Sequence, residues 1–389
     1  MGDGQTKILL VSNTSFFLHN FLQGLMKRFR EERFDVVGLA PPDVYSEKLT
    51  NNGFRLVPIS RLDRKGSNPL HDVKLMLELR RIYRQERPNL VLHFTIKLNV
   101  YGSIAARLAG TKSVCTVTGL GWLFTDKGLK ARLGSLGYKV LYRIAFSFSK
   151  HVVFLNKDDR AFFLGNGLAK DSRSSVIPGA GVNTENFDPG FCGAAGRNLP
   201  VLSMAPGLSF LLIGRMLWDK GVGEFVEAAS IVKQREPDAR FLLLGPIDKD
   251  NRSAIPEAVI AEWESKDLVH YLGRTDDVRP YICATDAIVL PSYREGIPSA
   301  LLEAMAMGKP VITTNTPGCR DVLDDGKNGF IAPERDARAL ADCMLRFIAL
   351  SQDERRAMGK YARERVLREF DEKVIVGSYL QLITNAMRS

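Results

Sequence analysis

The chain has 389 residues, of which 45% are hydrophobic and 25% are charged, and its 54 basic and 44 acidic residues give a formal net charge of +10. This composition is that of a globular protein and excludes disordered and collagen-like classes. No apolar run approaches the roughly 20 residues of a membrane-spanning helix, and residues 1–15 lack the apolar segment of a signal peptide. The length favours two or three domains.

The cysteine pattern favours a reducing compartment. The five cysteines are odd in number, scattered, and form no CxxC pair, so we expect neither a disulfide framework nor a zinc site. They are Cys115, Cys192, Cys283, Cys319 and Cys343.

The basic charge lies in one half of the chain. Residues 1–200 hold 29 Lys and Arg against 16 Asp and Glu, a net of 29 − 16 = +13, whereas residues 201–389 hold 25 against 28, a net of −3. The first half is therefore expected to meet an anionic partner. The sequence has no zinc-finger spacing, RNP motif or long basic tail, so a nucleic-acid partner is not expected.

Short apolar runs alternate with amphipathic stretches along the whole chain. Runs without polar alternation are typical of parallel strands that are buried on both faces. The predicted strands are, in chain order, 7–14, 34–41, 55–60, 89–95, 113–119, 151–156 and 174–179, then 209–214, 239–245, 270–273, 287–292, 310–314 and 329–333. Helices are predicted at 21–32, 73–88 and 222–237, the last two ending at a proline.

This alternation predicts an α/β protein with two doubly wound, Rossmann-like domains. We expect an N-terminal domain over residues 1–190, a Gly-, Ala- and Pro-rich linker over 191–209 and a C-terminal domain over 210–369. A final helix over 370–389 is expected to pack back toward the N-terminal domain. Ligands bind beyond the carboxyl ends of such strands, so two facing domains would form a cleft for two substrates.

Two stretches of the second half carry candidate chemistry. In residues 287–313, Glu295 lies in a loop and Glu303 in the following helix, which we expect to begin at a capping Ser299. Backbone N–H groups from Gly296 to Ala300 would bind an anion there, and carboxylates suit sugar hydroxyl groups. The alternative is a capped, exposed helix with incidental glutamates.

The other stretch is residues 210–225. Arg215 follows a strand and Lys220 lies five residues further on, and two such cations suit a diphosphate. The alternative here is a pair of solvated surface cations.

The motifs GRMLWDKG, SYREGIPSALLEAMAMGKPVITT and PGCRDVLDDGKNGFIAP, in this order, resemble glycosyltransferase family 4. In the first half, LHFTIKLNVYGSIAARLAG, VTGLGWLFTDKG, FLNKDDRAFF and IPGAGVNTENFDP resemble its capsular and O-antigen polysaccharide branch. The resemblance covers nearly the whole chain. It implies the GT-B fold and a retaining, metal-independent enzyme that uses a nucleotide-sugar donor and no cofactor.

The resemblance also implies roles for individual residues. Arg215 and Lys220 match the pair that neutralises the departing diphosphate, and Glu295 matches the glutamate that contacts the donor sugar. Glu303 matches the glutamate that binds the ribose hydroxyls. The amides of Gly296, Ile297 and Ser299 would hold the distal phosphate.

The first half departs from the family pattern where the acceptor is expected to bind. The loop SNTSFFLHNF stands in place of a Gly-Gly loop, Thr118 stands where many members have His, and Leu98 stands where Pro is common. The candidate acceptor-binding residues are Asn13, His19, His93, Lys97, Asn99, Thr118 and Gly119. For both histidines a structural role is the favoured alternative. The Asp248–Lys249–Asp250 triplet is interpreted as solvent-facing and not as a metal site.

Residues 126–150 combine cations with an apolar stripe at helical spacing. Such basic amphipathic helices bind anionic bilayers. The stripe consists of Leu129, Leu133, Leu136, Val140, Ile144 and Phe148, and the candidate membrane-contacting cations are Lys127, Lys130, Arg132, Lys139 and Arg143. The alternative is that the stripe packs on the sheet of its own domain.

Together these observations predict a cytoplasmic glycosyltransferase that is peripherally bound to the inner face of the plasma membrane. It would transfer a sugar from a UDP-linked donor to a lipid-diphosphate-linked saccharide in bacterial surface polysaccharide synthesis. The alternatives are a sugar-nucleotide epimerase or hydrolase of the same fold, and a non-catalytic scaffold of a polysaccharide assembly complex.

Overall fold

The computed structural model describes residues 5–63, 68–119, 129–192 and 207–388, and for residues 129–136 it describes the backbone only. The chain divides into two compact units. Unit 1 runs up to Ala180 and takes in the end of the chain from Glu372, whereas unit 2 is Gly181–Asp371. The chain therefore passes from one unit to the other twice, and residues 181–190 and 370–371 lie in unit 2.

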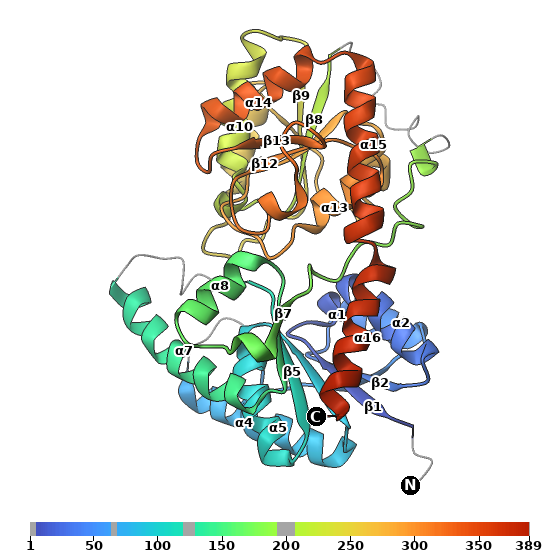
Figure 1. Cartoon of the computed structure of the whole chain (residues 1–389). Helices are drawn as coiled ribbons and strands as arrows, with labels where there is room; N and C mark the ends of the chain where they lie inside the picture. The colour runs from blue at the N-terminus through green and yellow to red at the C-terminus, as the bar shows by residue number, and fades with distance from the viewer. Residues whose placement is uncertain (1–4, 64–67, 120–128, 193–206, 389) are drawn as a thin grey trace. The chain divides into compact units, whose positions relative to one another are not determined.

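Unit 1 is built on a parallel sheet of seven strands in the order β3-β2-β1-β4-β5-β6-β7 (Figure 1). The strands are β1 (Lys7–Val11), β2 (Asp35–Ala40), β3 (Arg55–Pro58), β4 (Leu90–Phe94), β5 (Lys112–Val117), β6 (His151–Phe154) and β7 (Ser174–Val176). The helices are α1 (Ser15–Phe21), α2 (Gln23–Glu31), α3 (Val44–Asn51), α4 (Pro69–Glu86), the π-helix η1 (Leu98–Gly102), α5 (Ser103–Ala109), α7 (Leu129–Phe148), α8 (Lys157–Gly165), the short η2 (Asp171–Arg173) and α16 (Glu372–Arg388).

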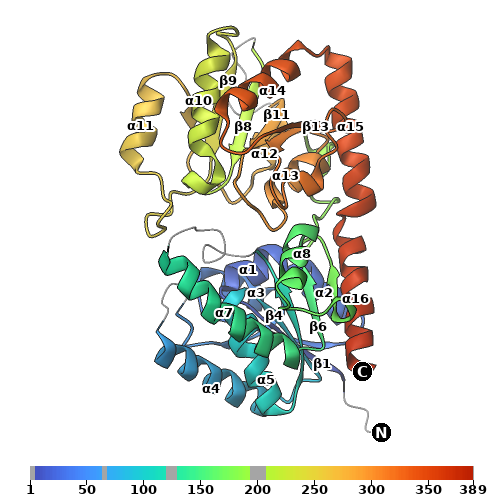
Figure 2. The same ribbon diagram turned by 60° about the vertical axis from the view of Figure 1, so that its left-hand side comes forward.

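Helices cover both faces of this sheet. The helices α1, α2 and α16 pack on one face, where Met26, Phe29 and Tyr379 share a buried cluster with strand residues such as Leu10. The helices α4, α5 and α7 lie along the other side of the sheet (Figure 2). The strands β1, β2, β4 and β5 are mostly apolar without alternation because both of their faces are buried.

Unit 2 repeats the design with a parallel sheet of six strands in the order β10-β9-β8-β11-β12-β13. The strands are β8 (Ser209–Ile213), β9 (Arg240–Leu244), β10 (His270–Tyr271), β11 (Ala287–Leu290), β12 (Val311–Thr314) and β13 (Gly329–Ala332). The helices are the short η4 (Trp218–Lys220) and η5 (Arg320–Val322), with α10 (Val222–Lys233), α11 (Glu257–Ser265), α12 (Arg279–Cys283), α13 (Ser299–Ala306), α14 (Ala337–Ala349) and α15 (Gln352–Glu369). Each predicted strand contains one observed strand, and the prediction of two doubly wound domains is confirmed.

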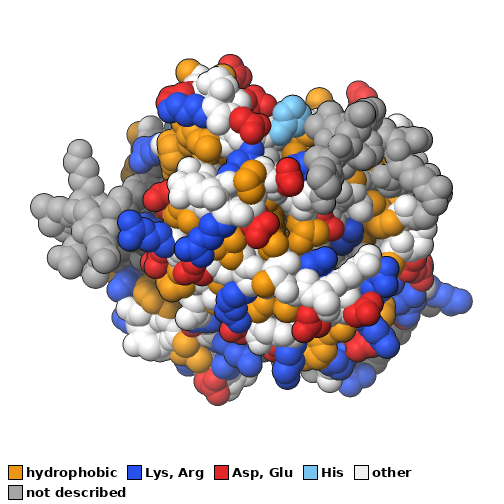
Figure 3. Space-filling model, turned by 90° about the horizontal axis from the view of Figure 1, so that it is seen from above, with side chains coloured by type: hydrophobic (Ala, Val, Ile, Leu, Met, Phe, Trp, Pro, Cys, Tyr) orange, Lys and Arg blue, Asp and Glu red, His pale blue; other side chains and the backbone are white. Residues whose placement is uncertain are grey.

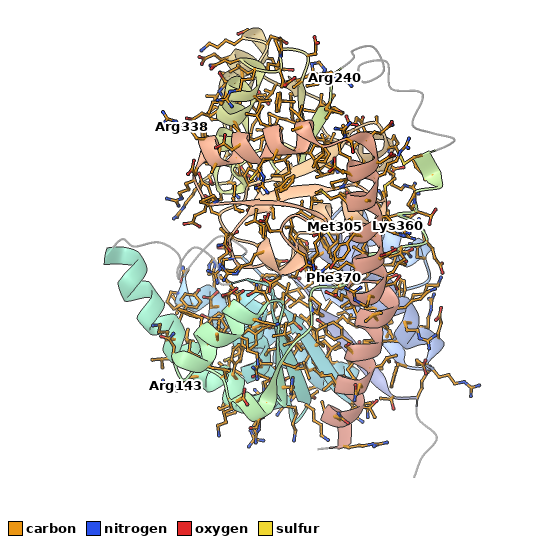
Figure 4. The ribbon with its side chains drawn as sticks, turned by 45° about the horizontal axis from the view of Figure 1, so that its top comes forward. Arg143, Arg240, Met305, Arg338, Lys360 and Phe370 are labelled. Carbon is orange, nitrogen blue, oxygen red and sulfur yellow. A yellow bond between two sulfur atoms is a disulfide. The ribbon has the colours of Figure 1, made fainter. Side chains whose placement is uncertain are left out.

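The last two helices belong to different units. The helix α15 packs in unit 2, where Val366 and Phe370 share a buried cluster with Met305 of α13 (Figure 4 labels the last two). Asp371 ends this stretch, pairing with Val182 and accepting a hydrogen bond from the Thr184 hydroxyl. The helix α16 then packs against α2 and β5 of unit 1 (Figure 1).

One prediction from the cysteine pattern is wrong. The structure joins Cys192 to Cys283 in a disulfide that connects the segment before residue 193 to α12. Arg279, one turn earlier on α12, contacts the same segment: its guanidinium lies over the Phe191 ring and donates to Asn186 Oδ1 at 2.8 Å. The other three cysteines are free and buried. Counting cysteines could not reveal the pair, because 91 residues separate its members.

Candidate active site

The candidate site of unit 2 is built on the loop from Pro291 to Pro298, which connects the carboxyl end of β11 to α13. Hydroxyl groups hold this loop from both sides. The Ser292 carbonyl oxygen accepts hydrogen bonds from Thr314 Oγ1 at 2.5 Å and Thr316 Oγ1 at 3.0 Å. The Ser292 hydroxyl itself donates to the Asp219 carbonyl oxygen at 3.1 Å. The loop is therefore fixed to the neighbouring β12 and to the segment that follows β8.

Two glycines allow backbone segments to approach this loop closely. Gly318 has φ = +81°, and a Cβ atom there would lie 2.5 Å from the carbonyl oxygens of Glu295 and Gly296. Gly221 has φ = +71°, and its Cβ would lie 2.1 Å from the Pro291 carbonyl oxygen. Both positions combine a left-handed backbone with a space that no side chain fits. The loop is thus held between two backbone segments, and each can approach it so closely only because it has a glycine at the point of contact.

The predicted Lys220 and Glu295 are brought into direct contact. Lys220 is the last residue of η4, and its Nζ forms an ion pair with Glu295 Oε1. Both side chains are largely buried, and the contact joins residues that are 75 positions apart. A pair of this kind fixes the cation and the carboxylate at one point of the sheet edge.

Arg215 has a partner that the sequence analysis did not assign to it. Its Nη1 donates to Asp248 Oδ2 at 2.9 Å, so Asp248 is not merely solvent-facing as predicted. Asp248 follows β9, which neighbours β8 in the sheet, and this adjacency brings the two side chains together. Each predicted cation of the site therefore has its own carboxylate.

The helix α13 begins at the predicted residue but not with the predicted cap. Ser299 is its first residue, Pro298 occupies the capping position, and no side chain caps the helix. Gly296 and Ile297 lie directly before it, so the predicted anion-binding segment precedes a helix of eight residues. The first N–H groups of such a helix have no partner within the helix and carry partial positive charge.

Glu303 lies on α13, one turn after that helix start. The protein packed around its carboxyl group raises the pKa to about 8, because burial disfavours the charged form. Glu303 therefore takes up a proton more readily than an ordinary surface glutamate does.

In unit 1, two of the candidate acceptor-binding residues are buried. His93 is fully buried, its Nε2 lies 2.9 Å from the Tyr83 hydroxyl, and burial lowers its pKa to about 3. Asn99 is also fully buried and donates to the Thr116 carbonyl oxygen at 2.8 Å. The structure thus gives both side chains contacts inside the protein, and for His93 this is the structural role that the sequence analysis favoured.

Four other candidates remain accessible at the carboxyl ends of strands or just beyond. Asn13 follows β1, and Thr118 and Gly119 follow β5, all of them partly exposed. His19 lies on α1, with its Nδ1 at 3.1 Å from Asn20 Oδ1. The two strands β1 and β5 both neighbour β4, so these residues lie at one edge of the sheet.

Lys97 is held by residues that the sequence analysis missed. Its Nζ lies 2.7 Å from Asp72 Oδ1, and the Tyr101 hydroxyl donates to the other oxygen of this buried carboxylate at 2.9 Å. Just before it, Thr95 has φ = +75°, which is rare for a β-branched residue, and the π-helix η1 follows. Strained residues and π-helical turns are common at functional sites. No sequence spacing signals this cluster, since Asp72 lies 25 positions away on α4.

The part of the α7 stripe whose side chains the structure describes, from Val140 to Phe148, faces solvent and not the sheet. Val140, Ile144 and Phe148 are 53%, 42% and 39% exposed, while the face that packs on the core consists of other residues, including Tyr142 and Phe146. The alternative that this part of the stripe packs on its own domain is therefore wrong. The structure adds a second exposed stripe on α4, formed by Leu70, Val73 and Leu77.

The candidate membrane-contacting cations have different environments. Lys127 lies outside the described residues, and Lys130 and Arg132 lie in the part of α7 whose side chains are not described. Lys139 donates to Asn166 Oδ1 at 2.8 Å and Arg143 to the Gly167 carbonyl oxygen at 3.1 Å, so both cations also hold the end of α8. Arg143 is labelled in Figure 4.

Two negative findings apply to the described residues. None of the helices whose positions the structure gives is both long and apolar enough to cross a bilayer. Within the same parts of the chain, no three or more His, Cys, Asp or Glu side chains gather so as to hold a metal ion.

On the face of the molecule shown in Figure 3, basic and acidic side chains are interspersed.

Comparison with known proteins identifies the family. The model described as Glycosyl transferase 4-like matches residues 7–156, and the model described as Glycosyl transferases group 1 matches residues 207–349. N,N'-diacetylbacillosaminyl-diphospho-undecaprenol alpha-1,3-N-acetylgalactosaminyltransferase of Campylobacter jejuni is 28% identical over 388 residues, which cover 98% of this chain and 100% of that protein. UDP-Gal:alpha-D-GlcNAc-diphosphoundecaprenol alpha-1,3-galactosyltransferase of Escherichia coli is 27% identical over 71% of this chain and 70% of its own length.

Solved structures agree on the fold. Sucrose-phosphate synthase from Thermosynechococcus elongatus matches with a TM-score of 0.82 at 20% identity, over 98% of this chain and 99% of that one. HepE of Anabaena in complex with UDP matches with a TM-score of 0.78 at 17% identity, over 98% and 100%. The fold is GT-B. The chain belongs to the glycosyltransferases that the group 1 and 4-like models describe, and the predicted family is confirmed.

The close approach at Gly318 leads to the first prediction. Gly318→Ala would force the loop away from its position, because the added Cβ meets backbone oxygens that have no room to move. We expect at least a tenfold loss of UDP affinity in calorimetric titration. Gly326→Ala is the matched control, since Gly326 has a similar φ of +75° but no atom within 4 Å of the added Cβ. Equal losses in the two variants would contradict the role of close packing.

Proposed function

We propose that the chain transfers a sugar from a UDP-linked donor to a saccharide carried on a lipid diphosphate, with retention of anomeric configuration and without a metal ion. The observation that carries the proposal is the Lys220–Glu295 ion pair on a fixed loop at the carboxyl edge of the unit 2 sheet. In open α/β sheets this edge is where ligands bind. Glu303 and the start of α13 lie along the same chain segment, within eight residues of Glu295.

The names of the relatives support the substrate classes. The relative from Campylobacter jejuni is named for an acceptor on undecaprenol diphosphate, and the relative from Escherichia coli for UDP-Gal and a diphosphoundecaprenol acceptor. The first of these spans essentially the same length as this chain. We therefore propose a lipid-diphosphate-linked saccharide as the acceptor and bacterial surface polysaccharide synthesis as the process.

In the proposed reaction, the acceptor hydroxyl oxygen bonds to the anomeric carbon while the bond from that carbon to the diphosphate oxygen breaks. The electron pair of the broken bond stays on the diphosphate, which also takes the acceptor's proton. Lys220 and Arg215 would stabilise the negative charge that develops there, as fixed cations do most effectively when they are already in position. Glu295 would turn from Lys220 to the donor sugar.

Metal independence is proposed on the same ground. A guanidinium and an ammonium group beside the leaving diphosphate supply two positive charges, the role that a divalent ion has in other sugar transferases. Both cations have carboxylate partners that orient them, Asp248 for Arg215 and Glu295 for Lys220. Entry of a diphosphate would exchange a carboxylate partner for a phosphate partner at each cation.

We further propose that the exposed stripe of α7 contacts an anionic membrane at the inner face of the plasma membrane. Its apolar side chains face solvent beside Arg143, and the stripe of α4 adds Leu70, Val73 and Leu77 with the exposed Lys74 nearby. Burial of such side chains in lipid, together with basic charge, is how interfacial helices bind. A lipid-linked acceptor would require the enzyme to work at this surface.

The alternatives make different predictions. An epimerase or hydrolase of the same fold would release nucleotide without an acceptor, and a scaffold would show no turnover. The decisive assay therefore incubates the protein with a panel of nucleotide sugars, with and without lipid-diphosphate-linked saccharides, and identifies the products by mass spectrometry. Nucleotide release that is independent of acceptor, or none with any pair, would contradict the proposal.

Removing either member of the central ion pair is expected to stop transfer. Lys220→Ala and Glu295→Ala should each reduce kcat by about 100-fold or more, which is typical when one preorganised charge-stabilising group is lost. The rate is measured with the donor and acceptor that the assay identifies, and folding is checked by circular dichroism. Lys249→Ala is the control, since this exposed lysine pairs only with Glu257 among the ion pairs seen. Full activity in both site variants would contradict the assignment.

The raised pKa of Glu303 predicts a pH dependence of UDP binding. An ionised carboxylate accepts hydrogen bonds from two ribose hydroxyls, but below its pKa of about 8 the group must first lose a proton. Affinity should therefore rise with pH toward 8 and level off above it, with proton release on binding at lower pH. Titration calorimetry in buffers of different ionisation enthalpy measures this release. Glu303→Gln should remove this component while leaving the ionisation of UDP itself unchanged, and identical profiles would contradict the role.

Membrane contact is tested by flotation with liposomes that contain anionic phospholipid. The double substitution Val140→Asp with Ile144→Asp should abolish flotation, because it places carboxylates in the exposed stripe. The control is Leu367→Asp, which alters an apolar residue of similar exposure, 44%, on α15 of unit 2. Flotation that neither depends on anionic lipid nor responds to the double variant would contradict the proposal.

A further inference from the structure

We propose that unit 1 carries a second ligand site, separate from the donor and acceptor sites, which binds a phosphorylated sugar. The site is a groove of about 640 Å³ between α16 and the strands β6 and β7. This volume lies within the range of roughly 300–1,000 Å³ that is usual for small-molecule sites. The proposal does not depend on which donor or acceptor the enzyme uses.

The groove exists because α16 leaves part of one sheet face uncovered. On this face Val153 and Ile177 are buried in the cluster that includes α16. Residues two positions earlier on each strand point the same way, because side chains alternate along a strand. These are His151 and Ser175, which are polar and only partly buried, and their side chains lie 2.9 Å apart. Toward the amino ends of β6 and β7 the face therefore becomes polar.

The helix side of the groove is polar in the same region. Ser378, Gln381 and Asn385 line it, and their spacing of three and four residues places them on one face of α16. This face lies beside the buried stripe of Tyr379 and Ile383. Hydroxyl and amide side chains offer both donors and acceptors, which suits the hydroxyl groups of a sugar. Leu382 and Ala386 add apolar surface for its C–H groups.

The charges that line the groove are positive. Lys150 and Arg173 both belong to its lining, and none of the described lining residues is acidic. The Arg160 guanidinium donates to the Ser174 carbonyl oxygen and forms an ion pair with Asp171 at 2.5 Å. The Asp171 carboxylate, which lies near the groove, is therefore already paired with a cation. Burial and then Arg160 lower the pKa of His151, which leaves a neutral ring as a hydrogen-bonding group. A phosphate group would meet an ammonium and a guanidinium here.

The position of the groove separates it from the acceptor site. His151 and Ser174 are the first residues of β6 and β7, so the groove lies at the amino ends of the strands. Acceptor candidates such as Asn13 and Thr118 follow the carboxyl ends of β1 and β5. In a parallel sheet these are opposite edges, and one small molecule cannot occupy both.

Calorimetric titration with glucose 6-phosphate tests the proposal, with glucose and inorganic phosphate as the two partial probes. We expect glucose 6-phosphate to bind the full chain, and each partial probe to bind at least tenfold more weakly. Arg173→Ala and Ser378→Glu should each weaken binding at least tenfold. The serine variant places a carboxylate in the groove at an exposed helical position, where the effect on folding is small.

Matched controls locate the site. Ser147→Glu is the control for Ser378→Glu, since both serines are exposed on helices and donate to a carbonyl oxygen of the preceding turn. Arg107→Ala, on α5, is the control for Arg173→Ala, and both should bind as the unaltered protein does. Binding should also persist in Lys220→Ala, where the donor site is impaired.

Four results would overturn the inference. They are no binding of glucose 6-phosphate, equal losses in the groove and control variants, loss of binding in Lys220→Ala, and phosphate alone binding as tightly as the sugar phosphate. The third result would place the ligand in the donor site, and the fourth would reduce the groove to an anion site. None of these results bears on whether the chain transfers sugars.

Discussion

Close backbone packing around the loop from Pro291 to Pro298 is the constraint on which the active site depends. Gly221 approaches the loop at its start and Gly318 at Glu295, and both contacts leave no space for a Cβ atom. Hydroxyl groups of Thr314, at the end of β12, and of Thr316 just after it hold the Ser292 carbonyl oxygen in addition. Interiors packed in this way have few alternative arrangements. The backbone of Glu295 is therefore held in place, and its side chain reaches Lys220 from a fixed point.

The two cations of the candidate site are held by carboxylates, and only Lys220 is held by a residue of this loop. Each cation has a carboxylate partner, Asp248 for the exposed Arg215 and Glu295 for the largely buried Lys220, and for Lys220 burial without a partner would be costly. The partners also orient the cations, which reduces the reorganisation needed when negative charge develops. Glu303 is different, because burial raises the pKa of its carboxyl group to about 8. The candidate site thus combines two cations that already have carboxylate partners with a carboxyl group whose pKa is raised.

The sequence predicted the sheets well because parallel strands buried on both faces leave a plain apolar signal, as β4 and β8 show. Its motifs also singled out Lys220 and Glu295, whose side chains the fold brings into contact. It could not predict the Arg215–Asp248 pair, the Lys97–Asp72 pair or the Cys192–Cys283 disulfide, because each joins elements that only the fold makes neighbours. The orientation of α7 was open for a related reason. Periodicity identified an apolar stripe, but the helix has a second apolar face containing Tyr142 and Phe146, and only packing decides which face is buried.

In the unit 1 sheet, the candidate binding residues lie at the two ends of the strands, whereas the centre of the sheet contributes stability. Most side chains at its centre are apolar, with buried exceptions such as His93 and Thr116, and accessible polar residues such as Asn13 and His151 lie toward the ends of the strands. At the carboxyl ends of the strands, Thr95 has a strained backbone, a π-helix follows it, and Asp72 forms a buried pair with Lys97. These departures from ideal geometry reduce the folding stability, and the buried centre of the sheet can offset that loss. At the amino edge, α16 covers Val153 and Ile177 but leaves His151 and Ser175 accessible. If these strand ends were meant only to stabilise the fold, apolar residues at the two positions would suffice. The polar residues therefore indicate a surface that stays in contact with water. A hydrated groove with cations at its rim is suited to a ligand.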